Sequence, residues 1–426
     1  MKTKLTLFLI AIFGFASLTA QEFVQVPLGG SYANQAYYNI GTDAMDFLPN
    51  QSWDLAFATA PGSAGIFVNE ASASSMAGEA PELRLYLSYT TDFAEEIEPA
   101  LLAFSDSLYN EEIDWDNGAF NNPKDDGNSD DYGWGTYNPA TQAIEGDRVF
   151  ALQLRDDSWK KIFVESMASG LYTLKYADLD GANEETITID KADFAGSPLV
   201  LYSFTTGTAG PSPANWDLLF TRYRTALDPG DGVLLQYIVT GVLSGPGVET
   251  AEARGVDPQT VDFEPYWDSL STQLDIIGQD WKRFDLGSFM WVIDPERAFF
   301  VKTGDRLWKI VFYAFDGSST GIFTFEKTDL GFIYNTESLS GNVSGLTVFP
   351  NPVVEEMTVS FSLKERLQRL PLSLVDGLGR TVWQTTVRGD AGLNVLNLRL
   401  GAPTAGVYWL VVGNGDDQVT AKVVGR

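Results

Sequence analysis

The chain has 426 residues, 44% of them hydrophobic and 13% aromatic, which is enough for two or three domains with substantial cores. Its 28 Lys and Arg residues against 57 Asp and Glu residues give a formal charge of -29, which argues against nucleic acid and anionic membrane surfaces as partners. The absence of Cys and His excludes disulfides, thiolate or imidazole metal ligation, Cys nucleophiles and His-dependent catalytic triads.

Residues 1–20 have the pattern of a secretory signal peptide. Lys2 and Lys4 precede an apolar run from Leu5 to Phe15, and small residues up to Ala20 fit a signal peptidase site. The run is shorter than the ~20 apolar residues that a membrane-spanning helix needs. We therefore expect Sec export, cleavage after Ala20 and no transmembrane segment in the mature protein.

The region from 21 to 335 contains the same series of landmarks twice, which predicts an internal repeat. The matching pairs are Y-Y-N-I-G-T-D (37–43) with L-Y-S-F-T-T-G (201–207), W-D-L-A-F (53–57) with W-D-L-L-F (216–220), D-S-L (106–108) with D-S-L (268–270), and 147–163 with 296–312. We expect two homologous antiparallel β units, 21–190 and 191–335, with short strands separated by Gly and Asp turns. Helical periodicity is sparse, and its best candidates are 94–108 and 261–277.

The W-D-L-x-F landmarks predict core strands. Apolar residues alternate along the first landmark, which places Trp53, Leu55 and Phe57 on one face, and the second copy repeats the pattern. Asp54 and Asp217 are expected to accept backbone or indole N–H bonds rather than to bind a ligand.

The most distinctive segment is an acidic insertion at 114–135, because the aligned stretch of the second unit is much shorter. Its candidate metal ligands are Asp114, Asp116, Asn117, Asp125, Asp126, Asn128 and Asp130. Oxygen ligands on turning backbone suit Ca²⁺, although no Glu closes the loop as in an EF-hand. The alternative interpretation is a solvated acidic turn. Trp115, Tyr132, Trp134 and Tyr137 are predicted to be exposed aromatic residues that could stack on sugars.

Several motifs in order resemble the HmuY-like family of secreted haem-binding proteins. They are W-D-L-x-F, V-T-G-V-L (239–243), I-G-x-D-W-K (277–282), G-D-R-L-W-K-I-V-F (304–312) and G-x-F-T-F-E (321–326). The resemblance covers the second unit well and the first more loosely, and it implies a ligand-binding β-scaffold. Members hold haem iron with two histidines, which this chain lacks. Some relatives use methionine, so the resemblance implies Met76 and Met167 as the cofactor-binding pair.

Haem is nevertheless not an expected cofactor, because of the charge of the body. Residues 21–345 contain 18 Lys and Arg against 50 Asp and Glu, which gives -32. Such a surface repels the haem propionates.

Residues 346–426 differ from the body, with eight Lys and Arg against seven Asp and Glu. Short alternating runs broken by Gly, Asp and Pro predict a small immunoglobulin-like β-sandwich. P-N-P at 350–352, D-x-x-G-R at 376–380, G-V-Y at 406–408 and the basic ending at Lys422 and Arg426 resemble the type A C-terminal sorting domain of the type IX secretion system. The resemblance implies binding to that machinery and secretion or display at the outer cell surface. Residues 336–345 are expected to be a linker.

The sequence thus predicts an all-β protein with two homologous units and a sorting domain. We expect a non-enzymatic binding protein for an unknown small molecule, with no catalytic residues. A surface adhesin or carbohydrate-binding module for a surface glycan is the first alternative. A carboxylate-dependent glycoside hydrolase is the second, although nothing singles out one acid pair among 57 acidic residues.

Overall fold

The structure is a computed structural model that describes residues 21–72, 83–103, 106–228, 230, 232–332, 343–364, 366–400, 405–414 and 417–425. The chain divides into two compact units, a body (Met1–Gly331) and a C-terminal module (Phe332–Arg426). The regular secondary structure of the described residues is almost entirely β-strand, which confirms the predicted all-β fold class. No helix among them is long and apolar enough to cross a membrane.

The helical segments of the described residues are short 3-10 helices. They are η1 (Gly30–Tyr32), η2 (Glu70–Ser72), η3 (Pro99–Leu101), η5 (Lys191–Phe194), η6 (Glu264–Ser269) and η7 (Gly317–Ser319). The helices expected at 94–108 and 261–277 are therefore corrected to the short segments η3 and η6, because Pro99 and Pro265 lie inside the expected ranges and proline interrupts the interior of a helix.

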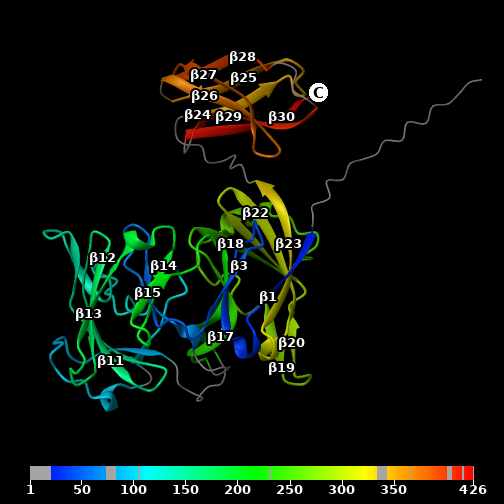
Figure 1. Cartoon of the computed structure of the whole chain (residues 1–426). Coiled ribbons are helices and arrows are strands. Elements are labelled where there is room, and N and C mark those ends of the chain that lie inside the picture. The colour runs from blue at the N-terminus through cyan, green and yellow to red at the C-terminus, as the bar shows by residue number, and fades with distance from the viewer. Residues whose placement is uncertain are drawn as a thin grey trace, which may run out of the picture. The chain divides into compact units, whose positions relative to one another are not determined.

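The middle of the body chain forms one lobe, called here the mid-chain lobe (Figure 1). Its larger sheet has the order β13 (Glu185–Asp190), β12 (Leu171–Ala177), β11 (Trp159–Ala168), β10 (Val149–Gln153), β6 (Arg84–Leu87) and β7 (Ser107–Leu108), with β9 (Ala143–Gly146) and β8 (Gly135–Asn138) attached to β11. Its smaller sheet has the order β15 (Thr208–Pro211), β14 (Leu199–Ser203), β4 (Leu55–Ala58) and β5 (Ile66–Val68). Phe57, Phe150 and Trp134 belong to the core shared by the two sheets.

The two ends of the body chain form the second lobe, called here the terminal lobe (Figure 1). Its larger sheet has the order β1 (Gln21–Pro27), β23 (Ile322–Phe332), β22 (Arg306–Phe315), β21 (Arg297–Thr303) and β18 (Val248–Arg254). Its smaller sheet has the order β17 (Leu235–Ser244), β16 (Leu218–Leu227), β2 (Asn34–Tyr38) and β3 (Met45–Pro49), and β19 (Lys282–Asp285) forms a hairpin with β20 (Met290–Ile293). Tyr38, Phe220 and Trp281 belong to its core.

The two lobes have matching strand orders, and each includes strands from both predicted units. The order β13-β12-β11-β10 corresponds to β1-β23-β22-β21, and β15-β14-β4-β5 corresponds to β3-β2-β16-β17. Strands β1 and β2 pair with β23 and β16, whereas β13 and β14 pair with β12 and β4. The predicted boundary at 190/191 therefore does not coincide with a boundary between lobes. Strands β1–β3 of the first predicted unit complete the terminal lobe, and β14 and β15 of the second predicted unit complete the mid-chain lobe.

The repeated landmarks make corresponding hydrogen bonds across this exchange. Asp54 donates its backbone N–H to Tyr202 O, and Asp217 donates its own to Tyr38 O, both at 2.8 Å. Each Asp carboxylate accepts the backbone N–H of the residue two positions after that tyrosine, at 2.7 and 2.8 Å. Asp54 and Asp217 therefore have the structural role that the sequence predicts.

The landmark tryptophans lie on the face opposite to the predicted one. Leu55 and Phe57 point into the core of the mid-chain lobe, whereas Trp53 packs with Ala56 and Phe67 on the other side of the sheet. The reason is that β4 begins only at Leu55, so the alternation does not extend back to Trp53. The second landmark follows the same pattern. Both smaller sheets are thus buried on two faces.

Trp115 of the acidic insertion connects the two lobes. Its ring centroid lies 5.7 Å from that of Phe67 and 5.6 Å from that of Trp216. Its indole Nε1 donates to Ser244 O at 3.0 Å. One end of the insertion is therefore anchored in the contact between the smaller sheets.

The C-terminal module is a β-sandwich, and its core includes Val359, Phe361 and Leu410. One sheet has the order β24 (Val343–Phe349), β25 (Glu356–Leu363) and β28 (Gly392–Arg399); the other has β27 (Thr381–Gly389), β26 (Leu367–Asp376), β29 (Gly406–Asn414) and β30 (Asp417–Gly425). Of the predicted linker, residues 343–345 open β24 and the rest lies outside the described residues.

Candidate functional site

The acidic insertion and the loop 60–64 enclose an open pocket of about 500 Å³ in the mid-chain lobe. Five of the seven predicted oxygen ligands line it, namely Asp116, Asn117, Asp125, Asp126 and Asn128. Asp114 and Asp130 belong to the same insertion but do not line the pocket. We call this feature the acidic pocket.

Asn121 fixes the insertion against β5. Its side-chain oxygen accepts the N–H groups of Ile66 and Gly118, at 2.9 and 3.1 Å. Its side-chain nitrogen donates to Ala64 O and Tyr132 O, at 3.1 and 2.8 Å. Gly118 is required at this contact, because a Cβ there would lie 2.1 Å from a backbone oxygen. The pocket wall is therefore held by a fully bonded amide that is 2% exposed.

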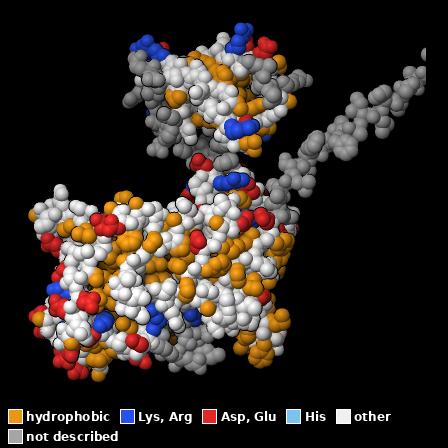
Figure 2. Space-filling model, in the orientation of Figure 1, with side chains coloured by type: hydrophobic (Ala, Val, Ile, Leu, Met, Phe, Trp, Pro, Cys, Tyr) orange, Lys and Arg blue, Asp and Glu red, His pale blue; other side chains and the backbone are white. Residues whose placement is uncertain are grey.

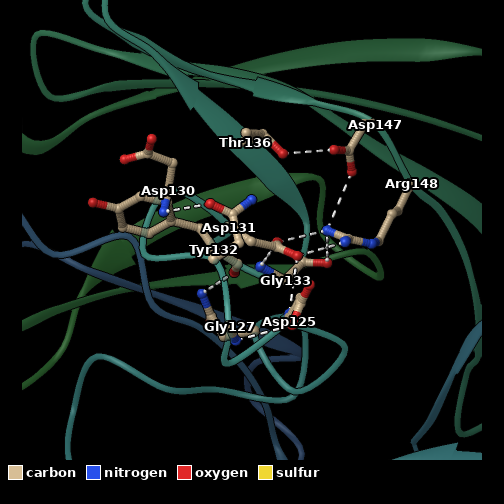
Figure 3. A network of polar contacts seen from close by, with 11 residues as sticks. Asp125, Gly127, Asp130, Asp131, Tyr132, Gly133, Thr136, Asp147 and Arg148 are labelled. Atoms are coloured by element: carbon tan, nitrogen blue, oxygen red, sulfur yellow. Dashed lines mark hydrogen bonds and ion pairs between the residues drawn. The ribbon is translucent and has the colours of Figure 1, made fainter.

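A second anchor is the ion pair between Asp131 and Arg148 (Figure 3). The guanidinium donates to both carboxylate oxygens, at 2.8 and 2.7 Å, and the backbone N–H groups of Asp125 and Gly133 bind the same carboxylate. Burial acts to raise the pKa of Asp131, but the bonds from Arg148 and the two N–H groups outweigh it and lower the pKa. Sequence reasoning missed Asp131 as an anchor. The sequence feature that could have indicated this anchor is Arg148, which aligns with Arg297 of the second unit.

Several predicted oxygen ligands are used within the turns of the insertion. Asp114 accepts the N–H of Asp116 at 2.8 Å and the side-chain amide of Asn117. Asp125 accepts the N–H of Gly127 at 2.9 Å, and Asn128 that of Asp130 at 3.1 Å (Figure 3). These are local Asx turns, which short polar side chains form without any ion.

Asp116, Asp126 and Asp130 are exposed, and their carboxylates accept no hydrogen bond from the described part of the chain. Within that same part, no group of three or more carboxylates lies close enough to hold a metal ion. Calcium in this insertion stays a prediction.

A second, more apolar pocket of about 550 Å³ adjoins the acidic pocket and shares Ala60, Pro61 and Asp116 with it. Trp115 and Lys191 also line it. The Lys191 ammonium donates to the backbone oxygens of the 60–64 loop, and burial lowers its pKa. The two pockets therefore offer carboxylates and amides beside an aromatic and aliphatic wall.

The prediction of an exposed aromatic set in the insertion is wrong for Trp134. This residue is fully buried and donates its indole N–H to Ala64 O at 3.0 Å. Trp115, Tyr132 and Tyr137 are half-buried. Residue type alone could not separate Trp134 from its half-buried neighbours, because its burial depends on the contact with the 60–64 loop.

The proposed methionine pair is not brought together by the described residues. Met167 lies on β11 opposite Tyr172 and Ile144, half-buried against the core of the mid-chain lobe. Met76 lies outside the described residues.

A separate group of carboxyls surrounds Tyr223 of the terminal lobe, in a pocket of about 340 Å³ that Asp275 lines. Burial raises the pKa of Asp275. Burial and the charge of Asp275 also raise the pKa of Glu112, whose Oε1 has no hydrogen-bond partner among the described residues. Neighbouring carboxyls with raised pKa values are an arrangement that acid–base catalysis uses, although structural groups show it as well.

Comparisons with known proteins address the C-terminal module. The family model of the secretion system C-terminal sorting domain matches residues 347–426. The module is a type IX secretion signal. The protein is therefore a secreted one that is attached to the cell surface or released. From here on we call this unit the sorting module.

The match to this family model does not extend into the body. No curated protein is significantly similar to the chain. Dimeric latent PorU from Porphyromonas gingivalis is a solved structure with 10% identity and a TM-score of 0.17, over 91% of this chain and 36% of that chain. The chain thus spans about a third of the length of that protein. A TM-score this low carries no inference about the body.

Proposed function

We propose that the protein is a secreted, non-enzymatic binding protein that takes a hydroxyl-rich ligand, such as a surface glycan, in the acidic pocket. The observation that carries this proposal is the pocket itself, where carboxylates and amides converge beside an apolar wall. Ligand sites typically combine an apolar lining with a few placed polar groups. The HmuY-like resemblance supports binding on this scaffold, but without His a haem ligand is not part of the proposal.

The chemistry of the pocket favours neutral sugars. Carboxylates accept hydrogen bonds from hydroxyl groups, and such charge-assisted bonds are roughly twice as strong as neutral ones. The side-chain nitrogen of Asn128, which lines the pocket, adds a donor. The excess of acidic residues disfavours anionic ligands. Asn121 and the Asp131–Arg148 pair hold the walls in place, so less ordering entropy is lost on binding.

The test is a microarray of neutral oligosaccharides probed with the secreted protein, followed by calorimetry with the strongest binder. Asp126→Asn should weaken that binding about tenfold through loss of a charge-assisted bond. Asp130→Asn is the matched control, because Asp130 is an exposed acid of the same insertion outside the pocket lining. Absence of binding, or an equal loss in both variants, would contradict the proposal.

The hydrolase alternative is favoured by the carboxyls around Tyr223 alone. Turnover of a panel of aryl glycosides that disappears in Asp275→Asn or Glu112→Gln would establish it in place of binding. We expect no turnover above the buffer rate.

A further inference from the structure

The sorting module has one closed side. Strand β24 lies against β30, so the two sheets meet there. Val353 donates its N–H to Val424 O at 2.7 Å, and the Asn351 side chain bonds to the backbone of Lys422 and Val424, both at 2.8 Å. The P-N-P segment and Val353 therefore bond to the edge strand β30 on this side.

The opposite side of the module is open among the described residues. There β28 pairs only with β25, and β27 pairs only with β26. The two edge strands follow one another in the chain, separated by residues 390–391. An edge strand presents unpaired N–H and C=O groups at every second residue, which is a template for an added strand.

Strand β28 has few of the features that usually protect an edge. Its eight residues pair with β25 in unbroken register, without a bulge. It contains no Pro or Lys, and its one charged residue is Arg399 at its last position, which pairs with Glu356 of β25. Leu393 and Val395 on its outward face are 72% and 59% exposed. Natural proteins block free edges with charges, prolines or bulges. An exposed apolar edge is therefore a site for a partner rather than a neutral surface.

We propose that the type IX secretion machinery binds the sorting module by adding a β-strand to the free edge of β28, with Leu393 and Val395 packed against the added strand. The family match requires a partner that binds this module. Residues 346–426 are almost neutral, with eight basic and seven acidic residues, so main-chain pairing and apolar contact fit the recognition of the module better than charge does. This inference is independent of the function proposed for the body.

The experiment expresses the full chain in a bacterium with a working type IX system and measures the secreted and periplasmic fractions by immunoblot. Leu393→Lys with Val395→Lys should lower the secreted fraction about tenfold, because lysines on an edge oppose strand addition. Val354→Lys is the matched control: Val354 is 56% exposed and lies beside the closed side. It should be secreted like the parent.

A second variant keeps the test independent of misfolding. Leu393→Thr with Val395→Thr removes the apolar contact but retains strand propensity. If the lysine variant is degraded in the periplasm, the secreted fraction of the threonine variant decides. Normal export of the folded double variants would overturn the proposal, as would an equal defect in Val354→Lys. A parent dimer that the lysines dissociate without affecting export would assign the edge to a second copy instead.

Discussion

The same position in the two lobes is occupied by very different connections. Between the D-S-L landmark and β10, the mid-chain lobe has the acidic insertion with its pocket. Between the second D-S-L and β21, the terminal lobe has the β19–β20 hairpin, where Leu286, Phe289 and Met290 are 77%, 76% and 64% exposed. Figure 2 shows hydrophobic side chains gathered at that end of the terminal lobe. The strand orders match and the connections differ, as expected where a scaffold is constant and its loops are specialised.

The largest effect is expected when the landmark tryptophans of the two lobes are truncated. Trp53→Ala and Trp216→Ala should each lower the free energy of unfolding by about 3 to 5 kcal/mol, the usual cost of removing a buried large aromatic side chain. Both residues lie in the contact between the smaller sheets, so both lobes should lose stability in one transition. Chemical denaturation of each variant measures this. A variant as stable as the parent would show that the lobes do not depend on this contact.

Phenylalanine variants sharpen the same test. Trp53 donates its indole N–H to the buried Gln35 at 3.0 Å, whereas Trp216 Nε1 has no hydrogen-bond partner among the described residues. Trp53→Phe leaves Gln35 without a donor and should cost about 1 to 3 kcal/mol more than Trp216→Phe. Equal costs would contradict this difference between the lobes.

The next largest effect on stability is expected from the arginines that hold the two connections in place, Arg297 in the terminal lobe and Arg148 in the mid-chain lobe. Arg297 pairs with Glu252 and Asp280, and its side chain is 2% exposed. Arg148 pairs with Asp131 and Asp147, and its side chain is 22% exposed. Arg297→Ala should therefore cost about 2 to 3 kcal/mol, since removing one partner of a buried pair is strongly destabilising.

Arg148→Ala should cost less stability than Arg297→Ala but should weaken glycan binding, because it releases Asp131 beneath the pocket. Thermal unfolding measures the loss of stability in both variants, and calorimetry measures their glycan binding. Arg297→Ala is the control for binding, since it lies in the other lobe.

The sequence predicted the fold class and the sorting module because strand alternation and the sorting motifs are local signals. It did not predict the exchange of β1–β3 and β14–β15, because Y-Y-N-I-G-T-D and L-Y-S-F-T-T-G are so alike that either could pair with either W-D-L-x-F strand. It placed five residues of the acidic pocket but not Asn121 or Asp131, whose roles depend on contacts with β5 and Arg148. Long-range contacts decide these cases.

A smaller effect is the pH dependence that Glu70 gives to the contact between the lobes. Its carboxylate accepts the N–H groups of Asn110 and Arg224, one from each lobe. Burial raises the pKa of Glu70 from 4.5 to about 7, against these bonds and the charge of Arg224. Because the folded state binds the proton of Glu70 more tightly than the unfolded state does, the stability that the protonated carboxyl confers is complete below pH 4.5 and is lost as the pH rises through 7.

Melting temperatures of the parent and Glu70→Gln between pH 4.5 and 8 test this linkage. The parent should lose a few degrees relative to the variant across that window. Parallel curves would show that Glu70 stays ionised throughout.

The smallest expected effect is stabilisation by calcium, which should depend on the acidic insertion and not on the hairpin. The carboxylates free of hydrogen bonds, such as Asp116 and Asp126, do not form a group of three within the described residues, so we expect affinity in the millimolar range, at the weak end for protein oxygen sites. With free calcium near the dissociation constant, the stabilisation is about 0.4 kcal/mol, a rise of about 1 °C in melting temperature. Calorimetry should show this rise in the parent but not in Asp114→Ala with Asp116→Ala. Asp285→Ala in the hairpin is the control and should keep it. A rise retained without Asp114 and Asp116 would place calcium elsewhere in the chain.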